Sequence, residues 1–322
     1  MRFVVFGAGA VGGVVGAQLH RAGHDVTLVA RGLHYNAIRN HGLTFESPAE
    51  RVQLDIPVVA DIAEVTFTAG TVVLLTVKTQ DTTACMNALR NNTGPDTPVV
   101  CIQNGVESER MVLRYFEKVY GIPVACPCLH LEPGVVRAYS APTTGILDIG
   151  RYPSGADAIA ADVAEALASA TFVSEVRSDI MRWKYRKLVR NLRNAIEAVS
   201  GRSAARGKLA GMATAEAEHV LAVAGIDVAS LDEDEERRGS ILQTGPVSGE
   251  SRPGGSVWQS LTREVGTVET DYLSGHIALL GRLHGIPTPI NSLLQGVAAE
   301  MAAAGSPPAT MTEDEFLELL EV

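Results

Sequence analysis

Residues 2–31 read RFVVFGAGAVGGVVGAQLHRAGHDVTLVAR, two apolar runs separated by a glycine-rich turn and an amphipathic stretch. Arg2–Phe6 predicts a buried strand, a helix is expected to run to about Ala22, and Asp25–Ala30 predicts a second strand. The glycines follow the pattern Gly-x-Gly-x-x-Gly, directly after the first strand and at the start of the helix. In this context the pattern is typical of a loop that binds the pyrophosphate of a dinucleotide.

The glycines of this loop have separate roles. We expect Gly7 to permit the tight turn, Gly9 to let the backbone approach the phosphates, and Gly12 to let the helix pack close to the strand. The helix N terminus adds N–H donors and the positive end of the helix dipole. The expected cofactor-binding loop therefore consists of Gly7, Ala8, Gly9, Ala10, Val11 and Gly12.

The end of the second strand indicates which dinucleotide binds. The strand leads into Arg31 with no Asp or Glu beside it. A carboxylate at this place holds the ribose 2′-hydroxyl of NAD, whereas an arginine accommodates the 2′-phosphate of NADP. The sequence therefore favours NADP(H), the alternative being that Arg31 is an ordinary surface residue.

Composition narrows the class of protein. The chain has 322 residues, 46% of them hydrophobic, and a formal net charge of −10, which argues against nucleic acid as a partner. No apolar run has the length of a membrane span, and no signal-peptide pattern precedes the first strand. The four cysteines have no disulfide-framework or zinc-site spacing, so we expect no metal and a cytoplasmic protein.

The chain divides into two parts of different pattern. Alternating strands and helices up to about Arg177 predict an N-terminal Rossmann-type, doubly wound sheet. From Ser178 only helical periodicity is evident, so the prediction is an α/β fold with a dinucleotide-binding domain at 1–177 and an all-α substrate domain at 178–322. The expected later strands are Thr71–Val77, Pro98–Ile102, Thr143–Gly150 and Thr171–Val176. The expected later helices are Asp81–Asn92, Ala156–Ala170, Asp179–Ser200, Gly207–Ala224, Asp232–Gln243, Glu264–His284, Asn291–Ala304 and Thr310–Leu320.

Two of these helices carry candidate catalytic groups. Lys187, Asn191 and Asn194 lie at i, i+4 and i+7, so their side chains line one stripe of the first helix. Such a stripe could line a polar pocket or could be a partly exposed surface, and Lys184 is a rival lysine nearby. In the helix expected at 264–284, Glu269 falls on the apolar face, where a carboxylate needs a partner.

Polar residues also end two buried strands of the first part. Lys78 follows the strand at 71–77, and Asn104 follows the strand at 98–102. Ligands of open parallel sheets bind at the carboxyl ends of the strands, so both side chains are expected near the cofactor. The alternative is that each polar residue simply terminates a strand.

Taken together, these motifs resemble those of the ketopantoate reductase (2-dehydropantoate 2-reductase) family over nearly the whole chain. The marks besides the glycine loop are, in order, the segment 77–80, Gln103-Asn104-Gly105, Trp183 with Lys187-Leu188 and Asn191, and Ser256 with Glu269 and Asp271-Tyr272.

The resemblance implies reduction of a 2-keto acid by NADPH to a 2-hydroxy acid, in pantothenate biosynthesis. It implies that Lys187 is the general acid and that Glu269 tunes it or binds a substrate hydroxyl. It also implies that Lys78 and Asn104 lie by the cofactor. Substrate binding is then expected of Asn104, Asn191, Asn194 and Ser256.

The sequence departs from the family pattern in the expected pocket. Ala195 stands where the family often has a second asparagine, and Pro253 stands where another asparagine often lies. These departures bear on the identity of the substrate more than on the reaction. The alternatives are a same-fold reductase of another carbonyl or an imine, and a non-catalytic NADP(H)-binding regulatory protein. A homodimer is a further expectation.

Overall fold

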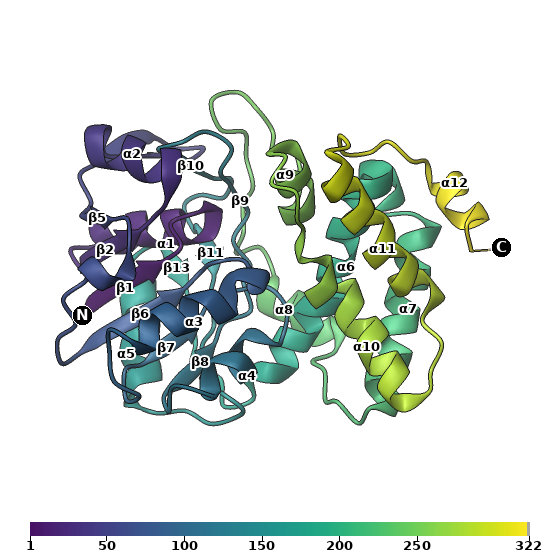
Figure 1. Ribbon diagram of the computed structural model, residues 1–322, viewed down its shortest axis with the longest axis horizontal. Helices are drawn as coiled ribbons and strands as arrows, with labels where there is room; N and C mark the ends of the chain where they lie inside the picture. The colour runs from purple at the N-terminus through teal and green to yellow at the C-terminus, as the bar shows by residue number, and fades with distance from the viewer. Residues whose placement is uncertain (321–322) are drawn as a thin grey trace. The chain divides into compact units, whose positions relative to one another are not determined.

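The computed structural model describes residues 1–320. Its main sheet has seven strands in the order β12-β8-β7-β6-β1-β2-β5 (Figure 1). Every neighbouring pair in it is parallel except β12 with β8. The strands are β1 (Arg2–Phe6), β2 (Asp25–Val29), β5 (Val58–Val59), β6 (Thr71–Leu75), β7 (Val99–Cys101), β8 (Val119–Gly121) and β12 (Gly150–Arg151).

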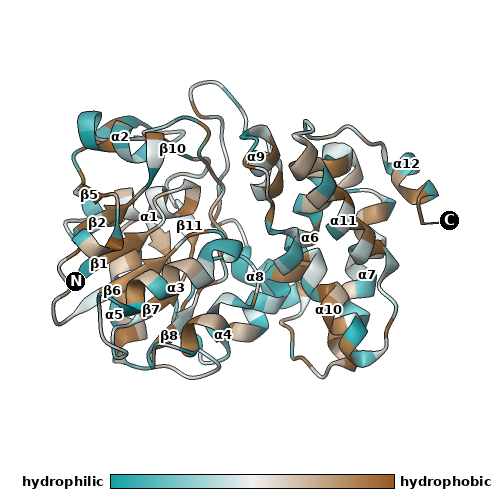
Figure 2. Cartoon of the chain, in the orientation of Figure 1, coloured by the Kyte–Doolittle hydropathy of each residue, from teal (hydrophilic) through white to brown (hydrophobic). Residues whose placement is uncertain are grey.

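The central strand β1 is buried on both faces of the sheet. Phe3 and Val5 belong to one hydrophobic cluster, whereas Val4 and Phe6 belong to another. Helices α1 (Ala10–Arg21) and α5 (Ala158–Ser169) contribute to the first cluster, and α3 (Thr82–Arg90) and α4 (Ser108–Leu113) contribute to the second. This is why β1 reads as a continuous apolar run instead of alternating, and Figure 2 shows the strands of this sheet as predominantly brown.

The order of the strands fixes where a ligand can bind. After β1 the chain builds β2 and β5 on one side and then returns to build β6, β7 and β8 on the other. The switch point therefore lies between β1 and β6, and a crevice is expected at their carboxyl ends.

Helices and two small sheets complete this part of the chain. The second sheet has the order β4-β3-β10-β9, and β11 pairs with β13. The helices are α1 (Ala10–Arg21), α2 (Gly32–His41), η1 (Ile62–Glu64), η2 (Thr79–Asp81), α3 (Thr82–Arg90), α4 (Ser108–Leu113) and α5 (Ala158–Ser169). The remaining strands are β3 (Leu43–Glu46), β4 (Arg51–Leu54), β9 (Cys128–Leu129), β10 (Val135–Ala138), β11 (Gly145–Ile146) and β13 (Phe172–Val173).

The remainder of the chain is helical. Helix α6 (Ile180–Ala204) is interrupted at Gly201, whose φ is +86°. The other elements are α7 (Lys208–Val223), α8 (Leu231–Arg238), α9 (Ser256–Thr262), η3 (Glu269–Tyr272), α10 (Ser274–His284), α11 (Pro289–Ala304) and α12 (Glu313–Glu318). The predicted fold class, a Rossmann-type doubly wound sheet followed by helices, is confirmed.

Contacts divide the chain into two units. The first unit holds Met1–Lys184 and Asp232–Arg252, and the second holds Tyr185–Leu231 and the chain from Pro253 onward. The sequence expectation placed a single boundary at 177/178. The returning segment 232–252 joins the first unit because Arg237 donates from Nε to Asp148 at 2.8 Å and Ser140 forms a β-bridge with Thr244.

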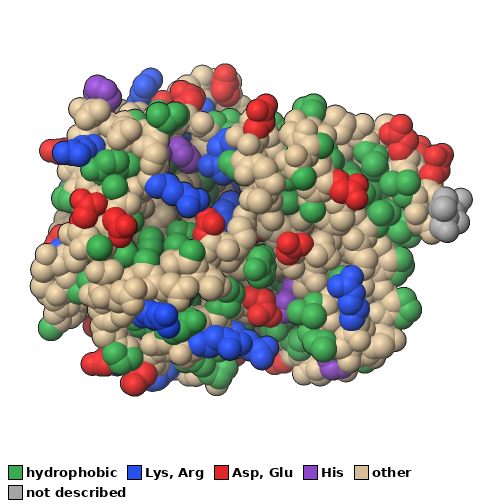
Figure 3. All heavy atoms as spheres, viewed as in Figure 1, with side chains coloured by type: hydrophobic (Ala, Val, Ile, Leu, Met, Phe, Trp, Pro, Cys, Tyr) green, Lys and Arg blue, Asp and Glu red, His purple; other side chains and the backbone are tan. Residues whose placement is uncertain are grey.

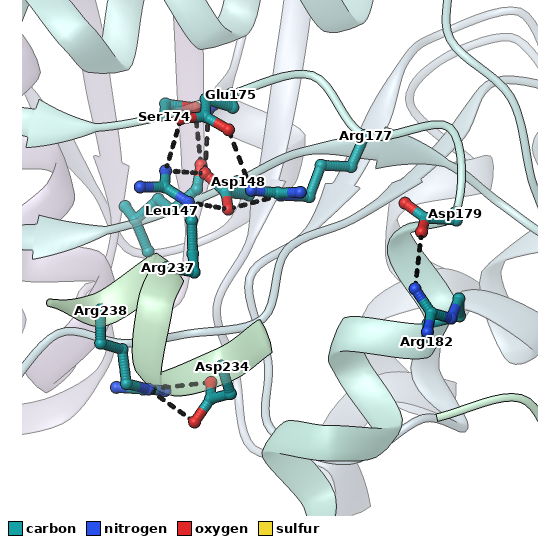
Figure 4. A network of polar contacts seen from close by, with 10 residues as sticks. All are labelled: Leu147, Asp148, Ser174, Glu175, Arg177, Asp179, Arg182, Asp234, Arg237 and Arg238. Atoms are coloured by element: carbon teal, nitrogen blue, oxygen red, sulfur yellow. Dashed lines mark hydrogen bonds and ion pairs between the residues drawn. The ribbon is translucent and has the colours of Figure 1, made fainter. Parts of the chain in front are cut away.

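Asp148 is the centre of a polar network in the first unit (Figure 4). Its side chain is almost fully buried. It accepts a hydrogen bond from Arg177 Nε at 2.9 Å and from the Glu175 amide at 2.9 Å, in addition to that from Arg237. Three residues from two separate segments of the chain thus donate to one carboxylate, which compensates the cost of burying it.

Some elements differ from the sequence predictions. The helix expected at 264–284 is instead the 3₁₀ turn η3 followed by α10. Glu264 and Gly266 have φ values of +52° and +72°, so no helix begins there, and Leu273, with φ −115° and ψ −93°, separates η3 from α10. Leu279 and Leu283 of α10 are exposed. The expected helix at 232–243 ends at Arg238, and the strand expected at 143–150 is divided into β11 and β12.

Charged side chains of both signs are present on the surface. Figure 3 shows lysines and arginines interspersed with acidic residues on the visible face, although the net charge is −10. None of the described helices is long and apolar enough to traverse a bilayer.

Candidate active site

The glycine loop has the geometry expected of a phosphate-binding turn. Gly7 has a φ of +112°, and a Cβ on it would lie 2.7 Å from Val77 Cγ1. A Cβ on Gly12 would lie 2.2 Å from Gly7 O, so only glycine lets α1 pack this close to β1. A Cβ on Gly9 would meet nothing within 4 Å. The space beside Gly9 is therefore open for a ligand, as a pyrophosphate site requires.

The N terminus of α1 offers donors to such a ligand. Gly9 is its N-cap residue, and no described side chain caps it. Ala10 and Val11 occupy its first turn and are half-buried, whereas Ala8 is buried and donates its N–H to Val29 O at 3.1 Å. The first N–H groups of a helix have no partner within the helix, so they can serve an anion.

A histidine that the sequence analysis did not single out supports this loop. His34 Nδ1 accepts a hydrogen bond from the Gly134 amide at 2.9 Å, so its proton is placed on Nε2, which donates to Ala8 O at 2.7 Å. The imidazole thus joins the glycine loop to the turn before β10. Nothing in the local sequence pattern indicates this role, since Gly134 is 100 residues away.

Arg31 lies where β2 leads into α2, as expected, and is the N-cap residue of that helix. Its side chain is 87% exposed, and its Nη2 lies 3.1 Å from Asp81 Oδ2. Burial and the charge of Asp81 raise the pKa of the neighbouring Cys85 thiol to about 11. Because the Arg31 guanidinium group is exposed, it can bind a phosphate, and Asp81 would compete with that phosphate for it.

The loops after β6 and β7 are hydrogen-bonded to each other. Gln103 Nε2 donates to Val77 O at 2.8 Å, and Thr79 Oγ1 donates to Asn104 O at 3.3 Å. Lys78 and Asn104, both half-buried, are therefore carried on adjoining loops at the carboxyl edge of the sheet.

The structure separates the two candidate lysines. Lys184 is only 2% exposed, forms an ion pair with Glu109, and donates to Gln103 O at 3.2 Å. Its ammonium group thus has two acceptors inside the first unit. Lys187 is half-buried and lies in the second unit.

The second unit brings three of the predicted substrate-binding residues together. Asn194 Nδ2 lies 3.4 Å from Asn191 Oδ1 and 3.4 Å from Ser256 Oγ. Asn191 is nearly buried, whereas Asn194 and Ser256 are half-buried. Ala195, one residue further, is fully buried in the hydrophobic cluster of this unit, so the amide that reaches Ser256 comes from Asn194.

An acidic residue of α6 anchors the start of α9, where Ser256 lies. Glu197 Oε2 accepts a hydrogen bond from the amide of Gly255, the N-cap residue of α9, at 2.8 Å. A Cβ on Gly255 would lie 2.8 Å from Asn194 Oδ1. The start of α9 therefore packs closely on α6. Arg186, also on α6, is 6% exposed and donates to Ala229 O.

Glu269 is buried, but not in the setting that the sequence suggested. It begins η3 instead of lying within a long helix, and it is 4% exposed. η3 packs against α10 and α11, and α9 packs against α11. A carboxylate in this position needs a charged or hydrogen-bonding partner to offset its desolvation.

Two protein-family models match this chain. The model of the family described as "Ketopantoate reductase PanE/ApbA" matches residues 3–154, and that of "Ketopantoate reductase PanE/ApbA C terminal" matches residues 179–302. The chain belongs to the ketopantoate reductase family. The resemblance inferred from the motifs is thus confirmed. Membership of this family supports the prediction that the protein is an oxidoreductase.

Several relatives have similar length but low identity. A 2-dehydropantoate 2-reductase of Pyrococcus horikoshii is 26% identical, over 95% of this chain and 100% of that protein. One of Archaeoglobus fulgidus is 29% identical, over 91% of this chain and 95% of that protein.

Solved structures share the fold. A PanE/ApbA family ketopantoate reductase from Ralstonia eutropha JMP134 has a TM-score of 0.79 and 26% identity, covering 95% of this chain and 99% of that one. D-mandelate dehydrogenase with NADH and anilino(oxo)acetate has a TM-score of 0.80 and 22% identity, with the same coverage. At that identity the likeness shows the fold alone.

Proposed function

We propose that this protein is an NADPH-dependent reductase of a 2-keto acid, with 2-dehydropantoate as the leading substrate and pantoate as the product. The observation that carries the proposal is the cluster of Asn191, Asn194 and Ser256 together with Lys187 in the same helical unit. Two amides, a hydroxyl and an ammonium group are the groups needed to bind a carboxylate and protonate a carbonyl oxygen.

The geometry of the first unit supports the cofactor half of the proposal. The glycine loop leaves open space at Gly9, and the N terminus of α1 provides donors for the pyrophosphate. Arg31 would bind the 2′-phosphate of NADPH with its planar fork. Lys78 and Asn104 would bind near the cofactor from the adjoining loops.

Each site residue then has a defined task. Bound NADPH supplies the hydride that adds to the carbonyl carbon. Asn191, Asn194 and Ser256 hold and orient the 2-keto acid. The Lys187 ammonium group donates a proton to the carbonyl oxygen as negative charge develops there, and it is protonated again from solvent. Glu269 favours the charged form of that lysine or binds a substrate hydroxyl.

The experiment is to follow oxidation of NADPH by the purified protein with 2-dehydropantoate and a panel of other 2-keto acids. Turnover of about 1 per second or more on one of them is expected. Parallel reactions with the corresponding 2-hydroxy acid, which has no carbonyl to reduce, control for unspecific oxidation. Tight binding of NADPH with no turnover on any keto acid, other carbonyl or imine would instead favour a regulatory protein. The assembly of this protein into a homodimer, expected from the sequence, stays a prediction.

A further inference from the structure

The first unit contains an ion pair withdrawn from water. Glu109, in α4, is fully buried, and Lys184, in α6, is 2% exposed. Nothing in the described part of the chain hydrogen-bonds to Glu109 Oε2. A Cβ added to Gly121 would lie 3.1 Å from both Lys184 Cδ and Glu109 Oε1, so the pair is closely packed against β8. Burying two charges costs more than well-packed apolar side chains would, so stability alone does not explain the pair.

Lys184 has a second acceptor, and this acceptor belongs to the candidate site. Its Nζ donates to the carbonyl oxygen of Gln103 at 3.2 Å. Because a peptide group is planar and trans, the N–H of Asn104 must point in the direction opposite to that carbonyl. Lys184 therefore fixes the plane of the peptide that carries Asn104 into its loop.

The side chain of Gln103 fixes the same loop from another direction. Its Nε2 donates to Val77 O at 2.8 Å and to Thr82 Oγ1 at 3.0 Å. The loops after β6 and β7 are thus bound to each other through Gln103, and to α6 through Lys184. Released from Lys184, the Gln103 peptide would be free to rotate, while the side-chain contacts would remain.

We propose that the buried Lys184–Glu109 pair positions Asn104 for the reaction, so that Lys184 is a positioning residue and not the acid. This inference rests on the proposed function, in which Asn104 binds near the cofactor and the substrate. Glu109 holds Lys184 in place through the ion pair, and Lys184 holds the Gln103 carbonyl. The role of this buried ion pair is therefore to fix the orientation of the peptide group between Gln103 and Asn104.

The test replaces both members of the pair, because Lys184→Met alone would leave Glu109 charged and buried without a partner. The double variant Lys184→Met/Glu109→Leu is expected to fold and bind NADPH, but to lose about ten- to hundredfold in kcat, as misplacement of a site group does. The matched control is Arg137→Met/Glu46→Leu. It removes an ion pair between β10 and β3, with a nitrogen–oxygen distance of 2.6 Å, and should keep its kcat.

Two readouts distinguish positioning from a general effect on the fold. Asn104→Ala should lower kcat by itself and should add no further loss in the double variant, because both changes remove the same interaction. Amide hydrogen exchange of the segment 102–106 should be about tenfold faster in the double variant and unchanged in the control. Lys184→Arg, which keeps the charge, should fold and give an intermediate exchange rate.

A normal kcat in the folded double variant would overturn the proposal. So would losses that multiply with that of Asn104→Ala, or exchange at 102–106 that neither Lys184 variant alters. A wild-type protein that reduces no 2-keto acid would refute the proposed function, and the exchange measurement would still decide whether Lys184 holds this loop.

Discussion

At the scale of single residues, the glycine loop gives the sharpest contrast, because its glycines are required for different reasons. Gly12→Ala should destabilise the protein by about 1–3 kcal/mol or more, since its Cβ would overlap Gly7 O. Gly9→Ala has room for its methyl group and should unfold at nearly the wild-type temperature, yet bind NADPH poorly. Thermal melting combined with NADPH titration checks both variants. Loss of the fold in Gly9→Ala would contradict the open site.

Lys187 is the residue on which the proposed chemistry depends. Lys187→Ala should lower kcat by about 10²–10⁴-fold, the contribution typical of a general acid, with NADPH binding nearly unchanged. Steady-state kinetics and fluorescence titration of NADPH test this. A variant with normal kcat would remove Lys187 from the mechanism and return attention to Lys184.

Arg31 should discriminate between the two nicotinamide cofactors. Arg31→Ala should weaken the binding of NADPH much more than that of NADH. Asp81→Asn should strengthen the binding of NADPH, because the guanidinium group loses its competing carboxylate. Neither change should alter stability measurably, since the pair is exposed. Dissociation constants for both cofactors provide the measurement. Equal weakening of NADPH and NADH by Arg31→Ala would rule out a 2′-phosphate role.

At the scale of elements, the sequence predicted best where one strong signal acts locally. β1, α1 and β2 follow from apolar runs and glycine spacing, and their bounds agree with the prediction within about two residues. The break between η3 and α10 was missed because apolar spacing continued across it, while the break depends on the non-helical backbone of Leu273, with φ −115° and ψ −93°. The small sheet β4-β3-β10-β9 was also missed, since its strands are short and the pair that joins its two halves, β3 with β10, links segments far apart in the chain.

The candidate site shows the same difference between residues with a local sequence signal and residues that act on distant segments. Asn191 and Asn194 could be placed on one stripe from helical spacing alone. His34, Gln103 and Glu197 could not be assigned their roles, because each acts on a backbone group that is distant in the sequence. A side chain that holds a remote carbonyl or amide leaves no local pattern.

The junction between α6 and α9 gives a prediction at this scale. Glu197→Ala removes the acceptor for the Gly255 amide and should loosen the start of α9, where Ser256 lies. KM for the keto acid should rise several-fold, while the dissociation constant of NADPH stays unchanged. Glu318→Ala, on α12, is a control at a carboxylate outside this junction. An unchanged KM would show that Ser256 does not need this anchor.

At the scale of the whole molecule, Asp148 joins the returning segment 232–252 to the rest of the first unit. Asp148→Ala would leave Arg177 and Arg237 without this partner and should destabilise the protein by about 3–5 kcal/mol. Limited proteolysis should then cut the segment 239–255 faster than in the wild type. Arg238→Ala, which removes an ion pair with Asp234 within α8, should have a smaller effect. Resistance of Asp148→Ala to proteolysis would contradict the anchoring role.

The path of the chain also determines how the protein can be cut into fragments and recombined with its relatives. The chain passes between its two units three times, after Lys184, Leu231 and Arg252. No single cut therefore releases either unit complete: a fragment ending at Lys184 lacks the helix that supplies Arg237 to Asp148. A single breakpoint between Asp148 and Arg237 would separate these partners in a chimera. Exchange of one complete unit with that of a related reductase would need three breakpoints, one at each passage of the chain.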